Sequence, residues 1–224
     1  MFLDRTEAAN KLAEKLLVYR GKNPLVLAIP RGAVPMAKII TEKLGGSIDV
    51  VLVRKLRAPF HPELAIGSVN ESGWTYIADY AASTGADNEY IQREKLAQMD
   101  VIKSRRAQYT PIRPSIDPKG RIVIIIDDGL ATGATMISAL HALRDRKPAK
   151  LICAVPVSPA ETLEKVAELA DELVCLEVPE DFQAVGQFYA NFPQLGDDEV
   201  MQILQSAQSE KQNNRFQTHV FGWQ

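Results

Sequence analysis

The sequence predicts an α/β domain in which five strands form a doubly wound, mostly parallel sheet. Five short runs of Val, Ile and Leu show little alternation with polar residues, which is typical of strands buried on both faces of a parallel sheet. Segments with helical spacing of apolar residues lie before and between these runs, and this alternation favours the doubly wound class. In chain order, the predicted strands cover residues 25–29, 50–53, 122–126, 151–155 and 173–176.

The helices are predicted from the spacing of apolar residues, in the same order. The first covers residues 6–18 and precedes the first strand. Two more follow the first and third strands, at 34–44 and 135–143. Another, at 160–170, separates the fourth strand from the fifth.

Residues 54–118 interrupt this alternation, and we interpret them as an insertion. They contain a hairpin-like pair of short runs, 64–69 and 74–77, and then a charged helix at about 87–108. Such an insertion is either a lid beside a site or a plain surface excursion, and the sequence leaves both readings open. A second irregular segment at 178–193 carries four aromatic residues.

The composition is that of an ordinary globular protein. Hydrophobic residues make up 46% of the 224 residues and charged residues 24%, which excludes wholesale disorder. Lys and Arg (26) nearly balance Asp and Glu (28), which argues against a general nucleic-acid binder. Cys153 and Cys175 form no CxxC pair, so neither a disulfide framework nor a thiolate metal site is indicated. With no apolar run near about 18 residues and no signal-peptide layout, we expect a soluble cytoplasmic protein.

The strongest chemical signal is an apolar strand that runs into Asp127 and Asp128. Small residues and hydroxyls follow and open a helix, a geometry in which backbone N–H groups and the helix N-terminus converge on a phosphate. Gly133 permits a close approach because it lacks a Cβ, and Thr132 and Thr135 add hydroxyl donors. No Gly-x-x-x-x-Gly-Lys precedes the helix, so this is not a Walker A loop. Because two carboxylates can accept hydrogen bonds from a diol, a phosphorylated sugar with vicinal hydroxyls fits the motif.

This segment resembles the signature of the type I phosphoribosyltransferases. That signature is an apolar strand, two acids, three residues, Thr or Ser, Gly, any residue, and then Thr or Ser, and residues 127–135 satisfy it throughout. The resemblance covers about residues 1–207 and implies the type I phosphoribosyltransferase fold. Within the family, the whole layout looks similar to a group of bacterial phosphoribosyltransferases whose acceptor is not assigned. It makes 54–118 a lid insertion and 178–193 a small C-terminal hood, and it leaves 208–224 as a tail that we expect to be loose.

The resemblance also extends to the first two strands. Residues 25–33 resemble the family's pyrophosphate loop, which implies a non-proline cis peptide bond between Pro30 and Arg31. The end of the second strand resembles the place where the family carries a basic residue near the pyrophosphate. Lys55 is our choice for that role, with Arg54 as the alternative.

The resemblance implies transfer of 5-phosphoribose from phosphoribosyl diphosphate, bound with Mg²⁺, to a nitrogenous base, with release of pyrophosphate. Asp127 and Asp128 would hold the ribose hydroxyls, and Asp127 would touch the metal through water, with no direct metal ligand from the protein. Arg31, Gly32 and Lys55 would hold the leaving pyrophosphate. The implied catalytic residues are Arg31, Lys55, Asp127 and Asp128. The implied donor site consists of Arg31, Gly32, Lys55, Asp127, Asp128, Gly129, Ala131, Thr132, Gly133, Ala134 and Thr135.

The acceptor stays open at this point. The 6-oxopurine enzymes of the family place an Asp just before the Thr-Gly pair, where this chain has Ala131, and this puts hypoxanthine and guanine in doubt. Phe182 or Tyr189 would stack on a flat base, although four aromatics in the hood also suit a small satellite core. Glu63 or Asp181 would act as a general base. By resemblance, we expect a homodimer. Because no apolar run is long enough to span a membrane, we expect no membrane partner.

Two other functions remain open. One is a catalytically silent sensor of phosphoribosyl diphosphate that binds nucleic acid, and the other is hydrolysis or phosphorolysis at the same site. The near-neutral charge argues against the first. The presence of Arg31, Lys55 and both acids favours the transferase.

Overall fold

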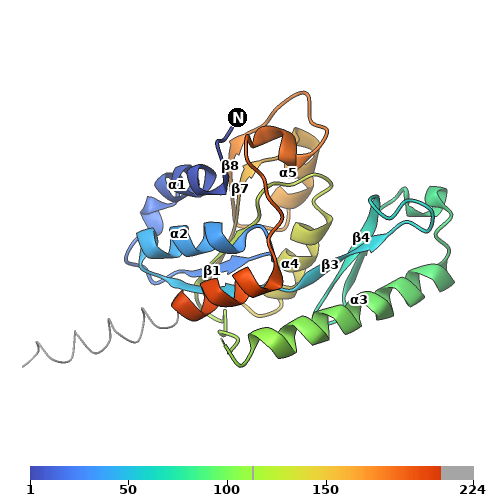
Figure 1. Ribbon diagram of the computed structural model, residues 1–224, viewed down its shortest axis with the longest axis horizontal. Coiled ribbons are helices and arrows are strands. Elements are labelled where there is room, and N and C mark those ends of the chain that lie inside the picture. The colour runs from blue at the N-terminus through green and yellow to red at the C-terminus, as the bar shows by residue number, and fades with distance from the viewer. Residues whose placement is uncertain (113, 208–224) are drawn as a thin grey trace, which may run out of the picture.

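The computed structural model describes residues 1–112 and 114–207, so the predicted tail at 208–224 lies outside the described residues. Its centre is a parallel sheet with the strand order β2-β1-β6-β7-β8 (Figure 1). The predicted five-stranded, doubly wound sheet is therefore confirmed. The strands are β1 (Leu25–Ala28), β2 (Ser47–Val50), β6 (Ile122–Ile126), β7 (Lys150–Val157) and β8 (Glu172–Glu177).

Helices cover both faces of the sheet. On one face, α1 (Arg5–Lys15) and α2 (Val34–Leu44) share an apolar core with the inward residues of β1, β6 and β7. On the other face, α4 (Ala134–Arg144) and α5 (Ala160–Ala167) share a second core with the alternate residues of the same strands. The predicted helices at 34–44, 135–143 and 160–170 are thus confirmed to within three residues at each end.

The second strand lies earlier than the sequence predicts. The prediction at 50–53 is wrong because β2 ends at Val50, and Val53 already belongs to the next sheet. The sequence did not predict β2 because Ser47 and Asp49 interrupt the apolar pattern of a buried strand. Both residues are polar but almost fully buried. The Asp49 carboxylate accepts backbone hydrogen bonds from Val50 (2.7 Å) and Ile116 (2.8 Å), which makes its burial tolerable.

Residues 53–109 form an arm that extends from the side of the core (Figure 1). Its antiparallel sheet has the order β3-β4-β5, with β3 (Val53–Arg57), β4 (Ala65–Asn70) and β5 (Thr75–Ile77). The predicted hairpin is β4 and β5, and the sequence missed β3. The predicted charged helix is α3 (Asn88–Tyr109), which packs beside β3 and β4 and buries Ile102 and Tyr109 in the core that contains α1 and α2. Within the described ranges, no helix is both long and apolar enough to cross a membrane.

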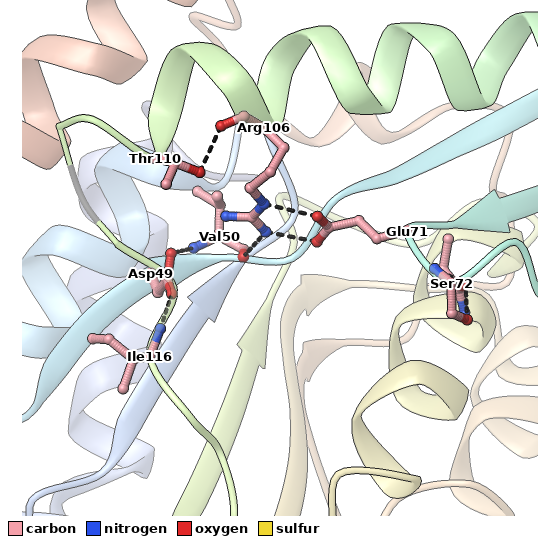
Figure 2. A network of polar contacts seen from close by, with 8 residues as sticks. Asp49, Val50, Glu71, Ser72, Arg106, Thr110 and Ile116 are labelled. Carbon is pink, nitrogen blue, oxygen red and sulfur yellow. Dashed lines mark hydrogen bonds and ion pairs between the residues drawn. The ribbon is translucent and has the colours of Figure 1, made fainter.

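Polar contacts attach the arm to the core at two places, and the first of them is buried. The Ser68 hydroxyl on β4 lies 2.6 Å from both the Ala134 carbonyl and the Ser138 hydroxyl of α4. At the far end of α3, the Arg106 guanidinium donates one hydrogen bond to the Val50 carbonyl of the core (3.4 Å), and two hydrogen bonds to the Glu71 carboxylate within the arm (2.7 and 2.6 Å) hold it in place (Figure 2). These contacts fix where the arm leaves the core, and its role as a lid stays a prediction.

The N-terminal segment of the chain contacts residues 178–193, which we call the hood. Phe2 forms a parallel bridge with Tyr189, and its backbone exchanges hydrogen bonds with Phe188 (2.7 Å) and Ala190 (2.8 Å). A helical stretch at 197–207 follows and buries Val200 and Leu204 against the core that contains α1 and α2. The hood is thereby held over the carboxyl end of β6 by the N-terminal segment.

Candidate functional site

A cleft of about 320 Å³ opens at the carboxyl ends of β1 and β6, the place where open α/β sheets bind ligands. It brings together residues from three separate sequence segments and the hood. Ten of the predicted donor-site residues line it: Arg31, Gly32, Lys55, Asp127, Asp128, Gly129, Ala131, Thr132, Gly133 and Thr135. Five other residues also line it that the predicted donor-site list did not include: Ile29, Pro30, Leu130, Val185 and Phe192.

The loop between β6 and α4 presents backbone groups and hydroxyls to the cleft. Gly133 is the N-cap of α4, with a positive φ of 73° that favours glycine. It offers no side-chain cap, and the Thr132 hydroxyl accepts a long hydrogen bond (3.5 Å) from the Ala134 backbone N–H. A Cβ on Gly133 would lie 2.8 Å from the Thr162 methyl carbon. The Thr162 hydroxyl donates a 2.6 Å hydrogen bond to the Ala131 carbonyl, so α5 holds the loop from behind. The N-terminus of α4 then faces the cleft, where it favours an anion.

Asp127 and Asp128 form the acidic floor of the cleft. The Asp127 carboxylate accepts a 2.9 Å hydrogen bond from the Asp128 backbone N–H. Burial and the neighbouring Asp128 charge raise the pKa of Asp127 well above its usual range, against the opposing charges of Lys55 and Arg5. Burial also raises the pKa of Asp128, while Arg5 opposes that rise. A ligand that donates hydrogen bonds or brings positive charge stabilises both carboxylates in their ionised form.

The basic side of the cleft comes from the β1–α2 loop and the arm. The peptide bond between Pro30 and Arg31 is cis, as the sequence analysis expected. The Arg31 guanidinium lies 3.6 Å from the Asp197 carboxylate, and its side chain is 36% exposed, so it is open to a further anion. Lys55 lines the cleft, whereas Arg54 turns away and donates a 2.8 Å hydrogen bond to Gln98. Of the two basic candidates, Lys55 is the one that the structure brings to the site.

Sequence reasoning missed Arg5, which reaches the site from the first turn of α1. Its guanidinium donates hydrogen bonds from Nε (3.0 Å) and Nη2 (2.8 Å) to Asp128 Oδ2. Arg5 lies 123 residues from Asp128 in the chain, so no local pattern could have linked the two.

The three predicted acceptor residues are not brought together. Phe182 lines a second cavity of about 400 Å³, which shares Ala131 and Thr132 with the cleft. Tyr189 is only 5% exposed, and its hydroxyl donates a 2.7 Å hydrogen bond to the Asp128 carbonyl, so its ring supports the site instead of lining it. Glu63 is exposed in the arm and lines neither cavity. The remaining donor-site residue, Ala134, lines the second cavity.

Comparison of this chain with known protein families assigns it to one of them. The family model described as "Phosphoribosyl transferase domain" matches residues 2–193, which include the cleft, the arm and the hood. The chain belongs to the phosphoribosyl transferase domain family. The family assignment from the signature at 127–135 is therefore confirmed, as is the fold that it implied.

Individual relatives agree with the family assignment. A Mycobacterium tuberculosis H37Rv protein that carries the provisional name phosphoribosyl transferase is 39% identical over 208 residues, which is 92% of this chain and 47% of that protein. The chain thus spans about half the length of this relative. A hypoxanthine-guanine phosphoribosyltransferase of Streptococcus pneumoniae is 24% identical over 85% of this chain and 86% of its own length. The crystal structure of TT1426 from Thermus thermophilus is 42% identical, with a TM-score of 0.76 over 92% of this chain and 98% of its own.

Proposed function

We propose that this phosphoribosyl transferase domain transfers 5-phosphoribose from phosphoribosyl diphosphate to a nitrogenous base and releases pyrophosphate. The observation that carries the proposal is the single cleft that joins an acidic pair, a phosphate loop and two basic side chains. The 5′-phosphate would lie on the loop at 131–135, and the ribose hydroxyls would donate to Asp127 and Asp128. Arg31, Gly32 and Lys55 would then face the diphosphate.

The reaction follows from this arrangement of charges. The bond between ribose C1 and the diphosphate oxygen breaks, and both of its electrons leave with the pyrophosphate. Positive charge develops on the ribose ring close to the two carboxylates, while Arg31 and Lys55 stabilise the negative leaving group. The acceptor nitrogen then forms the new bond to C1, and its proton passes to the released pyrophosphate or to water.

The residues of the cleft fit Mg²⁺ that arrives with the diphosphate. Mg²⁺ prefers phosphate oxygens and water and uses only one or two protein carboxylates. Asp127 and Asp128 supply such carboxylates, and among the described residues no cluster of three or more ligating side chains offers a separate cage. When bound, the metal supplies positive charge to the diphosphate and lowers the energy of its departure.

The second cavity supports a place for the acceptor. It adjoins the cleft at Ala131 and Thr132 and is walled by the rings of Tyr76, Tyr80 and Phe182. Aromatic walls with a few polar groups are typical of sites for flat ligands. Ala131 presents no carboxylate there, so the proposal still disfavours an acceptor that needs an acid at this position. We keep the homodimer and the cytoplasmic location as predictions.

Pyrophosphate release tests the proposal. Phosphoribosyl diphosphate and Mg²⁺ are supplied with a panel of purines, pyrimidines and other nitrogenous acceptors. The double variant Asp127→Asn/Asp128→Asn is the negative control, and Asp100→Asn, which alters an exposed carboxylate on α3, is the matched control. We expect acceptor-dependent release that the double variant loses and Asp100→Asn retains. Release that occurs equally without an acceptor would instead indicate a hydrolase, and donor binding without release would indicate a sensor.

A further inference from the structure

The Arg5 side chain stands directly behind the acidic floor of the cleft. It is only 11% exposed and does not line the cleft itself. Its Nε and Nη2 both donate to Asp128 Oδ2, and neither donates to Oδ1. One oxygen of the carboxylate is therefore fixed from behind, and the other is left for the cleft.

The position of Arg5 is itself fixed by the hood. Its Nη1 donates a 2.8 Å hydrogen bond to the Pro193 carbonyl, and its guanidinium carbon lies 3.8 Å from the centre of the Phe192 ring. Such a stacked, hydrogen-bonded guanidinium has little freedom to leave Asp128. Tyr189, also in the hood, donates to the Asp128 carbonyl, so the hood holds both the backbone and the side chain of this residue.

The positive charge of Arg5 offsets the repulsion between the two carboxylates of the site. Two adjacent carboxylates at the bottom of a cleft carry like charges that repel each other. The Arg5 guanidinium compensates this charge from the side opposite the cleft, where it does not occupy the space of the ligand.

We propose that Arg5 is a positioning residue that orients Asp128 for a sugar hydroxyl and ties its orientation to the hood. The inference rests on the proposed function, because it takes Asp128 as the acceptor of that hydroxyl. The opposite role would be a block, in which Arg5 competes with the sugar for Asp128. The two roles predict opposite changes in affinity when Arg5 is replaced.

The test uses two probes in the absence of metal and base. Ribose 5-phosphate reports on the phosphate loop and the hydroxyl contacts together, and inorganic phosphate reports on the loop alone. Calorimetry measures both affinities for the wild type, Arg5→Gln, Arg5→Lys and Lys11→Gln. Lys11 is the matched control, since it is a paired cation on the same helix that lies away from the cleft.

We expect Arg5→Gln to bind ribose 5-phosphate about tenfold more weakly, because the charge-assisted hydrogen bonds that orient one acceptor are lost. Its affinity for inorganic phosphate should not change. Arg5→Lys should recover part of the loss, because it restores the charge without the two-pronged geometry. Lys11→Gln should match the wild type. Thermal unfolding identifies a variant that fails to fold, in which case Arg5→Lys alone decides, with an expected loss of a few-fold.

Each other outcome has a defined meaning. Equal affinity of the variants and the wild type for ribose 5-phosphate overturns the inference, and so does an equal loss for both probes. Tighter binding by Arg5→Gln overturns it in favour of the block. If the wild type itself binds ribose 5-phosphate no better than phosphate, the hydroxyl contact is absent and the proposed function fails before Arg5 is tested.

Discussion

Replacing Gly32 by alanine should disable the donor site, although it adds only one methyl group. Gly32 lies in the β1–α2 loop with its α-carbon facing the Asp128 carboxylate. A Cβ built there would lie 2.9 Å from Asp128 Cγ and 3.0 Å from Arg5 Nη2, and it would overlap Asp128 Oδ2. The φ angle of Gly32 is not positive, so the effect comes from this contact and not from backbone strain.

The size of the effect follows from these distances. Carbon atoms in contact sit at about 3.5–4.0 Å, so the Asp128 carboxylate must retreat by roughly 1 Å. Its hydrogen bonds from Arg5, at 2.8 and 3.0 Å, cannot survive that movement intact. Overpacking costs about 1–3 kcal/mol, and weakening a charge-assisted bond adds about 1 kcal/mol or more. We therefore expect a loss of roughly 2–4 kcal/mol in folding stability, in donor affinity or in both.

Denaturant unfolding measures the loss in folding stability, and calorimetric binding of phosphoribosyl diphosphate with Mg²⁺ measures the loss in donor affinity. Gly196→Ala is the matched control, because its Cβ would meet only the end of the Glu199 side chain at 3.7 Å and its φ is not positive. It should leave both properties within about 0.5 kcal/mol of the wild type. A Gly32→Ala variant with wild-type stability and wild-type donor affinity would refute the close packing of this loop against Asp128.

Three further predictions concern the pair of acids, the arm and the helical stretch at 197–207. Burial and the Asp128 charge raise the pKa of Asp127, so the folded state keeps a proton that the unfolded chain releases, and stability falls as pH rises above about 4. Asp127→Asn should remove this slope and raise stability at pH 7 by on the order of 1 kcal/mol, as urea unfolding at pH 5 and pH 7 will show. Burial and the Asp197 carboxylate raise the pKa of Tyr109 to about 12; Asp197→Asn should lower it, as ultraviolet titration against a Tyr109→Phe blank will show. Ser68→Ala should cost about 1–2 kcal/mol by removing the buried bonds between β4 and α4, as thermal unfolding beside the exposed Ser104→Ala will show.

The parts of the site that the sequence predicted are local ones. The run from β6 through Asp127 and Gly133 into α4 is one continuous segment, so its strand, acids, turn and helix can be inferred without knowledge of the rest. The loop at Pro30 and Arg31 was identified through the resemblance to the family, and it too is a local segment that directly follows an apolar strand. Such segments place a ligand-binding turn at the carboxyl end of a parallel strand in any doubly wound sheet.

The parts that the sequence did not predict depend on tertiary contacts. β2 was misplaced because the buried Asp49 is satisfied by backbone groups, one of them from residue 116. Tyr189 was taken for a surface for stacking, yet its ring packs against Phe2, 5.5 Å between ring centres, and its hydroxyl supports Asp128. Arg5 carried no signal at all, because an arginine in the first turn of a helix is ordinary. Each of these residues acquires its role from a partner far away in the chain.

Calorimetric titration of phosphoribosyl diphosphate with Mg²⁺ tests the central claim most directly, because it needs no knowledge of the acceptor. The account predicts one binding site per chain in the wild type and an affinity at least tenfold lower in Asp127→Asn/Asp128→Asn, with Asp100→Asn unchanged. Absence of binding by the folded wild type, or equal binding by the double variant, would contradict the assignment of this cleft as a donor site.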